Sequence, residues 1–238
     1  MLKLRERCAR RGRTCPAAQT GDDLALHRSE NRRADDAALR RTQRRRKLVI
    51  LAGIAAALLV LAVSHSTYPS ESAFHEYLED LGAALIVFCI LGRTWASLYI
   101  GGNKRERLIG EGPYSVVRNP LYVFTVIGAA GIGFSTGSLA VGHVFAAIAF
   151  AVFHATVLSE ERYLRAKFGP AFDDYAHSAP RWVPRLAAWH DADWVRARPA
   201  VIRRTFVDAS LFLTALPLCE TIEYLQDTGL LPVLFHVP

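Results

Sequence analysis

Long runs of apolar residues, separated by short polar segments, dominate the chain from Leu48 onward. A helix needs about 20 apolar residues to cross the hydrocarbon core of a bilayer, with about 17 as a practical minimum. The second and fourth runs meet this length, whereas the first and third are short and need flanking residues to cross. The four runs cover residues 48–63, 81–100, 121–134 and 139–158.

A soluble helical protein does not normally contain four segments that are apolar on every face. The pattern therefore predicts an all-α fold, a polytopic membrane helical bundle of four to five spans in contact with the lipid bilayer. Only residues 135–138 (STGS) separate the third run from the fourth, which predicts a tight helical hairpin.

The C-terminal segment leaves the number of spans open. Residues 205–225 are apolar enough to suggest a fifth helix, but Asp208, Glu220 and Glu223 make it a poor span because charges inside a membrane are costly. Glu220, Glu223 and Asp227 recur at helical spacing and so fall on one face. That face either lines a polar cavity or meets water at the end of the helix.

Basic residues concentrate in an N-terminal arm, residues 1–47, which holds fifteen Lys or Arg and six Asp or Glu. The rest of the chain has slightly more acidic than basic residues, so the net charge of +7 does not indicate a nucleic-acid surface. Low apolar content predicts that the arm is disordered. It is either a solvated tail or an electrostatic anchor on anionic lipid.

The loops between the runs alternate in charge. Residues 64–80 contain acidic side chains and no Lys or Arg, whereas 101–120 and 159–204 are basic. The positive-inside rule therefore places the arm and these two basic segments in the cytoplasm, with the spans in a bacterial inner membrane. The four cysteines form no CxxC pair, and their spacing predicts neither a disulfide framework nor a metal site.

Polar residues cluster at the cytoplasmic ends of the third and fourth runs. The hairpin is expected to bring Arg118 next to Glu160 and Glu161, with Asn119 as a possible N-cap and Pro120 as an early helical residue. A cation, carboxylates and free backbone amides suit a zwitterionic ligand. The alternative is that the charges form a structural ion pair.

Aromatic residues accompany these charges. Tyr114, Tyr122 and Phe168 are candidates to face a planar base or a sulfonium by cation–π attraction. The alternative is that the two tyrosines belong to the aromatic belt of the membrane interface. Arg93 lies inside the second run, where an intramembrane charge requires a partner or binds a substrate anion.

Two motifs resemble the superfamily of isoprenylcysteine carboxyl methyltransferases and phospholipid methyltransferases. The first is GPYSVVRNPLY, 112–122, and the second is EERYLRAKFGPAFDDYAHSAPRWVP, 160–184. The residues that match the family pattern are Gly112, Pro113, Tyr114, Arg118, Pro120, Tyr122, Glu160, Glu161, Leu164, Phe168, Gly169, Phe172, Tyr175, Pro180, Arg181 and Pro184.

The resemblance implies an integral membrane enzyme that uses S-adenosylmethionine and methylates a lipophilic acceptor, with carboxyl O-methylation as the expected reaction. It implies a cytoplasmic cofactor pocket in which Arg118 and Glu161 are catalytic. The residues expected to bind the cofactor are Tyr114, Arg118, Asn119, Pro120, Tyr122, Glu160 and Glu161. Arg93 and Arg181 are expected to contact substrate.

One position departs from the family pattern. Asn119 stands where the superfamily usually has a histidine, and an asparagine cannot act as a titrating base near neutral pH. Phospholipid N-methylation, thiol S-methylation and a non-catalytic membrane protein with a degenerate site therefore remain alternatives. The predicted organisation is an arm at 1–47, a methyltransferase core at 48–185, and a cytoplasmic segment with a possible fifth span at 186–238.

Overall fold

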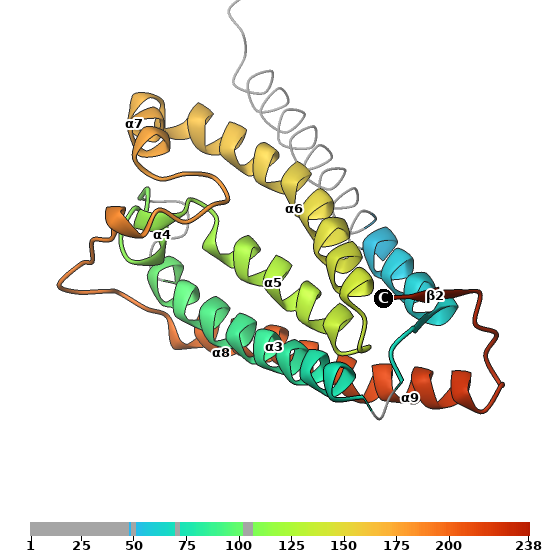
Figure 1. Cartoon of the computed structure of the whole chain (residues 1–238). Helices are drawn as coiled ribbons and strands as arrows, with labels where there is room; N and C mark the ends of the chain where they lie inside the picture. Colours follow the sequence, from blue (N-terminus) through green and yellow to red (C-terminus); the bar gives the residue numbers. More distant parts are fainter. Residues whose placement is uncertain (1–47, 49–50, 70–71, 102–106) are drawn as a thin grey trace, which may run out of the picture. The chain divides into compact units, whose positions relative to one another are not determined.

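The computed structural model describes residues 48, 51–69, 72–101 and 107–238 (Figure 1). Residues 49–238 form one compact unit. The arm, 1–47, lies outside the described residues, so its disorder and its lipid binding stay predictions. The proposed boundary between a core and a C-terminal segment at residue 185 also stays a prediction.

Helices account for nearly all of the regular structure. In chain order the elements are the helix Leu51–Val63, β1 (Ser64–Ser66), α3 (Ala73–Ile100), α4 (Pro113–Val116), α5 (Pro120–Phe134), α6 (Leu139–Phe168), α7 (Pro170–Ser178), the 3-10 turn η1 (Leu186–Ala188), α8 (Pro199–Ser210), the 3-10 turn η2 (Leu211–Thr214), α9 (Ala215–Asp227) and β2 (Phe235–Val237).

Within the part of the chain that the structure describes, three helical segments are long and apolar enough to cross a membrane: Ala73–Ile100, Leu139–Phe168 and Pro199–Asp227. Two further apolar helices, Leu51–Val63 and Pro120–Phe134, are shorter. These helices confirm the all-α membrane bundle. The segment Pro199–Asp227, built from α8, η2 and α9, has the length and composition of the fifth span that the sequence left open.

The short helix α5 does not lengthen as the sequence analysis expected of the third run, whereas the residues before Leu51–Val63 lie largely outside the described residues. At 1.5 Å per residue, the 15 residues of α5 span only about 22 Å, less than the roughly 30 Å of a bilayer core. The chain before α5, residues 112–117, is buried in the protein. Such burial is what non-helical backbone would need if it lay at membrane depth, where it has to be covered by protein or line a cavity.

Helix α5 packs between α3 and α6, and α8 packs against α3. Glycines permit the closest approach: a Cβ on Gly82 of α3 would lie 2.6 Å from the Gly131 carbonyl oxygen of α5. A Cβ on Gly131 would lie 2.7 Å from the Gly82 oxygen in turn. The glycines in the third run therefore serve helix packing, as expected for small residues in membrane helices.

Different elements lie at the two ends of the helical unit. At one end α4 and α7 lie close together, and at the other β1 and β2 form a short parallel pair (Figure 1). The second end also includes the turn between α5 and α6, because Ser66 Oγ donates to the Gly137 carbonyl and Ser138 Oγ donates to the Pro238 carbonyl. The strand pair is absent from the sequence prediction, since it joins segments 171 positions apart.

Candidate functional site

The first motif folds as a buried loop with one short helix. Pro113 is the first residue of α4, where its missing N–H removes a donor that would have no helical partner. The backbone of the second motif then closes over the loop. Arg118 N donates to the Pro180 carbonyl at 2.8 Å, and Tyr175 Oη donates to the Tyr114 carbonyl at 2.9 Å. Both contacts join the first motif to the second.

Glu161 is the point at which the charged residues of both motifs meet. Its carboxylate is buried, with 7% of the side chain exposed, and lies 3.3 Å from Arg118 Nη1. Arg181 grips the same carboxylate through Nε, at 3.0 and 3.1 Å from its two oxygens, and through Nη2 at 2.8 Å. A buried carboxylate is tolerated only when it is paired and hydrogen-bonded, and these two guanidinium groups meet that need.

Asn119 supplies a further donor to this carboxylate. Its Nδ2 lies 3.3 Å from Glu161 Oε1 and 3.4 Å from the Arg181 carbonyl oxygen. Asn119 does occupy the N-cap position of α5, and Pro120 is the first residue of the helix. The Asn119 side chain makes no capping bond, however, because the amide is turned toward Glu161. The amide thus adds one more contact to the charged cluster, and its expected part in cofactor binding stays a prediction.

Tyr122 and Glu160 form a second contact between the motifs. The Tyr122 hydroxyl donates to Glu160 Oε1 at 2.9 Å. The Tyr122 ring also packs against Phe153 of α6, with ring centroids 5.2 Å apart. The hairpin thus brings both members of the Glu160–Glu161 pair onto the first motif, as its short turn predicted.

Two buried polar atoms of the first motif have no hydrogen-bond partner among the described residues. These are Arg118 Nε and the Tyr114 hydroxyl. Leaving such a group unpaired costs about 1–3 kcal/mol. Arg118 contacts Glu161 through Nη1 and keeps Nε as a spare donor. Spare buried donors in this motif fit a ligand that carries a carboxylate or another acceptor.

Electrostatics fix the protonation of the surrounding groups. Burial raises the pKa of Tyr114 well above its usual value, so its hydroxyl stays protonated and can donate. Burial also raises the pKa of Tyr175, against the opposing effect of the Arg118 charge. The hydrogen bond to Glu161 raises the pKa of Arg181. The cluster therefore keeps its donors protonated throughout the physiological pH range.

Arg93 lies apart from this cluster, inside α3. Its Nη1 donates to Thr125 Oγ1 of α5, and its Nε has no hydrogen-bond partner among the described residues. The expected partner within the bundle is therefore a neutral hydroxyl. A role for Arg93 in binding substrate stays a prediction.

Residues that follow the second motif also contact the buried loop of the first motif. The sequence analysis did not predict these contacts. Arg185 N donates to the Val116 carbonyl, and Gly112 N donates to the His190 carbonyl, each at 2.9 Å. The Tyr99 hydroxyl donates to both oxygens of Asp191, at 2.9 and 3.1 Å. Backbone contacts carry no residue-type signature, so the sequence offered no sign of them.

A histidine lies near the second motif in space. Trp182 Nε1 donates to His154 Nδ1 at 3.1 Å, and the two rings stack with centroids 6.1 Å apart. An indole N–H can only donate, so His154 Nδ1 must accept. The proton of a neutral His154 ring is then on Nε2, and the Nδ1 lone pair is occupied by the indole N–H.

Comparison with known proteins identifies relatives of the chain. A family model described as phospholipid methyltransferase matches residues 81–171. The nickel-cobalt-cadmium resistance protein NccN of Alcaligenes xylosoxydans xylosoxydans is 29% identical over 185 residues, which are 78% of this chain and 86% of that protein. The cobalt-zinc-cadmium resistance protein CzcN of Cupriavidus metallidurans is 36% identical over 155 residues, 65% of this chain and 71% of that protein.

A protein-S-isoprenylcysteine O-methyltransferase of Schizosaccharomyces pombe is 30% identical over 84 residues, which are 35% of this chain and 36% of that protein. No solved structure matches the chain. The family model includes the whole first motif and the glutamate pair, and ends before Tyr175 and Arg181.

Proposed function

Because the chain belongs to the superfamily of integral membrane methyltransferases that includes the phospholipid and isoprenylcysteine carboxyl methyltransferases, we propose that it transfers a methyl group from S-adenosylmethionine to a lipophilic acceptor. The observation that carries the proposal is the meeting of the two motifs at Glu161. Arg118 and Glu161 are 43 positions apart in sequence, yet their side chains are in contact, with Glu161 buried and Arg118 only 13% exposed.

Arg118 is the residue that we assign to the carboxylate of the cofactor. Its Nη1 is engaged with Glu161, which fixes the direction of the guanidinium, while its buried Nε remains free to donate. Glu161 acts chiefly by orienting Arg118 and Asn119. Glu160 offers a carboxylate to the ammonium group, and the Tyr114 hydroxyl offers a further donor. Tyr122 and Pro120 shape the wall beside them.

The bound cofactor supplies an activated methyl group, so the protein mainly has to position the two reactants and exclude water. A carboxylate acceptor needs no base, whereas an amine or a thiol must lose a proton. Asn119 cannot take up a proton near neutral pH, and the lone pair of His154 Nδ1 is held by Trp182. These two residues favour carboxyl O-methylation over phospholipid N-methylation and thiol S-methylation.

We place this site on the cytoplasmic side of a bacterial inner membrane. The described residues of the basic segments 101–120 and 159–204 belong to this end, whereas 64–80 contains no Lys or Arg. A lipophilic acceptor would enter sideways from the bilayer, while the cofactor would enter from the cytosol. The two entry routes suit a site in which a short helix, α5, begins below the membrane surface.

A cellular role follows from the names of two relatives. NccN and CzcN are named for resistance to nickel, cobalt, zinc and cadmium, and each aligns with more than two thirds of its own length. We propose that methyl transfer by this chain contributes to resistance against such divalent ions. In a metal-sensitive host, the wild-type chain should then raise the tolerated cobalt concentration, and Glu161→Gln should not.

The enzymatic proposal is tested by isothermal titration of S-adenosylhomocysteine into the full chain purified in detergent. We expect saturable binding by the wild type and at least about tenfold weaker binding by Glu161→Gln, since about 1.4 kcal/mol corresponds to a factor of ten. Glu220→Gln makes the same chemical change at an exposed position on α9 and should bind normally.

Absence of binding by a folded wild type would favour the degenerate, non-catalytic alternative and remove the proposal. Where binding is found, mass spectrometry of lipid extracts incubated with protein and isotopically labelled cofactor identifies the acceptor. A labelled methyl ester supports carboxyl methylation. A labelled amine or thioether supports one of the other two reactions.

A further inference from the structure

A second group of polar side chains lies at the end of the unit that carries β1, β2 and the turn between α5 and α6. His75 is its most buried member, with 1% of the residue exposed. Neither ring nitrogen of His75 has a hydrogen-bond partner among the described residues. Its Nε2 lies between two carboxylates, 3.4 Å from Glu79 Oε1 and 3.6 Å from Glu223 Oε1.

The turn between α5 and α6 holds the His75 ring in this position. A Cβ on Gly137 would lie 2.1 Å from the ring, so only glycine leaves room for it. Gly137 also has φ = 64°, a conformation that favours glycine. A buried ring that is fixed so closely, yet lacks hydrogen bonds, has the character of a preorganised ligand.

His65 is a second histidine of this group, and its tautomer is set by the backbone. Its Nδ1 lies 2.9 Å from the Ser66 carbonyl oxygen, which can only accept, so Nδ1 carries a proton. In the neutral ring Nε2 then presents a lone pair to Asp227 Oδ1 at 3.2 Å. An imidazole held through Nδ1–H to a carbonyl is the usual arrangement of a histidine that binds a metal through Nε2.

Glu223 belongs to both clusters. One cluster is His75, Glu79 and Glu223, the other is His65, Glu223 and Asp227, and the ligand atoms within each lie within 4.8 Å of one another. Zinc bonds of about 2.0–2.1 Å in a tetrahedron place neighbouring ligand atoms about 3.3–3.4 Å apart. The histidine nitrogen lies at similar distances from the carboxylate oxygens. His65 Nε2 is 3.2 Å from Asp227, and His75 Nε2 is 3.4 Å from Glu79 and 3.6 Å from Glu223.

The surrounding sequence contains no lysine or arginine to neutralise these carboxylates. Residues 64–80 and 205–238 include all five members of the two clusters and not one basic residue other than histidine. Carboxylates brought together without a cation repel one another, and burial raises the free-energy cost of leaving their charges unbalanced. The negative charge is balanced either by protonated histidines or by a bound cation.

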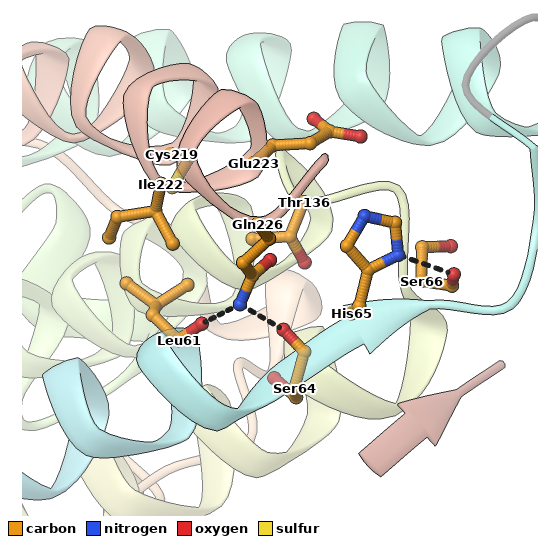
Figure 2. A pocket seen from close by; sticks show the side chains of 9 residues that line it. All are labelled: Leu61, Ser64, His65, Ser66, Thr136, Cys219, Ile222, Glu223 and Gln226. Atoms are coloured by element: carbon orange, nitrogen blue, oxygen red, sulfur yellow. Dashed lines mark hydrogen bonds between the residues drawn. The ribbon is translucent and has the colours of Figure 1, made fainter. Parts of the chain in front are cut away.

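A small cavity adjoins this group. It has a volume of about 20 Å³, enough for a water molecule or a single ion. Figure 2 shows His65 and Glu223 among the side chains that line it, together with Gln226, whose Nε2 donates to the carbonyls of Leu61 and Ser64. Asp227 is 55% exposed, which gives the group access to solvent.

We propose that these two clusters form adjoining binding sites for divalent transition-metal ions, with Glu223 as the shared ligand and each histidine Nε2 as the nitrogen ligand of its own cluster. Imidazole and carboxylate together suit borderline ions of the zinc and cobalt kind. The cysteine spacing predicted no metal site, because these ligands are histidines and acids from three separate segments. The proposal is independent of methyl transfer, since none of its residues belongs to the two motifs.

Equilibrium dialysis of the full chain in detergent, stripped of metal with a chelator and then exposed to micromolar Zn²⁺, tests the site. We expect at least one zinc ion per chain by elemental analysis. Co²⁺ should give the visible absorption of a four-coordinate ion. Glu79→Gln and Asp227→Asn change partly exposed side chains and should fold, yet each should weaken zinc binding by about tenfold or more.

His75→Ala and His65→Ala should each weaken zinc binding further, and the double variant should abolish the cobalt spectrum. Glu220→Gln and His143→Ala are matched controls, an exposed acid on α9 and an exposed histidine in the first turns of α6, and both should bind as the wild type does. Zinc binding that is absent, or that is unchanged in both Glu79→Gln and Asp227→Asn, overturns the proposal and leaves protonated histidines as the counter-charge. S-adenosylhomocysteine affinity is measured on the same samples, so the two proposals fail separately.

Discussion

Arg118 and Arg181 contact the same carboxylate, but we expect their removal to have different consequences. Arg181 makes three contacts of 2.8–3.1 Å with Glu161 and ties the segment after α7 to α6. Arg118 makes one contact of 3.3 Å with Glu161 and keeps a buried donor free. The geometry therefore gives Arg181 the larger part in stability and Arg118 the larger part in ligand binding.

The stability effect can be bounded from these contacts. Hydrogen bonds between charged groups contribute about 1.5–3 kcal/mol when buried, whereas exposed ion pairs contribute about 0.2–1 kcal/mol. The Arg181 side chain is 37% exposed, so solvent screening reduces its contribution to about 1–2 kcal/mol. At about 2–4 °C per kcal/mol for a chain of this size, Arg181→Gln should lower the thermal unfolding midpoint by about 2–8 °C.

For ligand affinity we expect the opposite order, with the larger loss in the Arg118 variant. Arg118→Met should weaken S-adenosylhomocysteine binding by about tenfold or more, because a charged donor to the ligand is lost. Its cost in stability should not exceed about 1 kcal/mol, since its single bond to Glu161 is long and methionine fills the space. Arg181→Gln should change the affinity by less than about threefold.

Thermal unfolding in detergent and isothermal titration on the same preparations measure both quantities. Arg162→Met, an exposed arginine beside Glu161, is the control and should leave both unchanged. The assignment is refuted if Arg181→Gln loses ligand affinity while Arg118→Met keeps it. Equal losses of affinity in both variants would show instead that the guanidinium pair acts as one binding unit.

Three further predictions follow from the structure. Gly131→Ala should destabilise the fold by at least about 1–3 kcal/mol, because its Cβ meets the Gly82 carbonyl at 2.7 Å; an unchanged unfolding midpoint would contradict the helix contact. His154→Phe should leave the methylation rate largely unchanged, because its Nδ1 lone pair already accepts from Trp182, whereas loss of a general base costs about 10²–10⁴-fold. A loss of that size in His154→Phe would overturn this reasoning. In a cysteine-free background, an impermeant maleimide added to intact cells should label Thr67→Cys and not Trp194→Cys, and the opposite pattern would reverse the orientation.

Hydrophobic patterning predicted the helical bundle, the hairpin and the meeting of the two motifs. Bilayer thickness sets the length of a span, and a four-residue turn forces α5 and α6 to be neighbours. Arg118 and Glu161 therefore had to lie at the same end. The same patterning could not settle the fifth span, because the cost of a charge in a helix depends on what it meets after folding. Glu223 faces His75 from another helix, a contact that no local pattern contains.

The sequence by itself determined which segments are apolar, which loops are basic and which residues match the family motifs. Only the tertiary structure decided which charged and polar side chains pair with one another. It turned Asn119 from a helix cap toward Glu161 and put Arg181 on that carboxylate. It also placed His65 beside Asp227, 162 positions away. These pairings depend on the directions of side chains from elements distant in the chain, and such directions are fixed only when the elements pack.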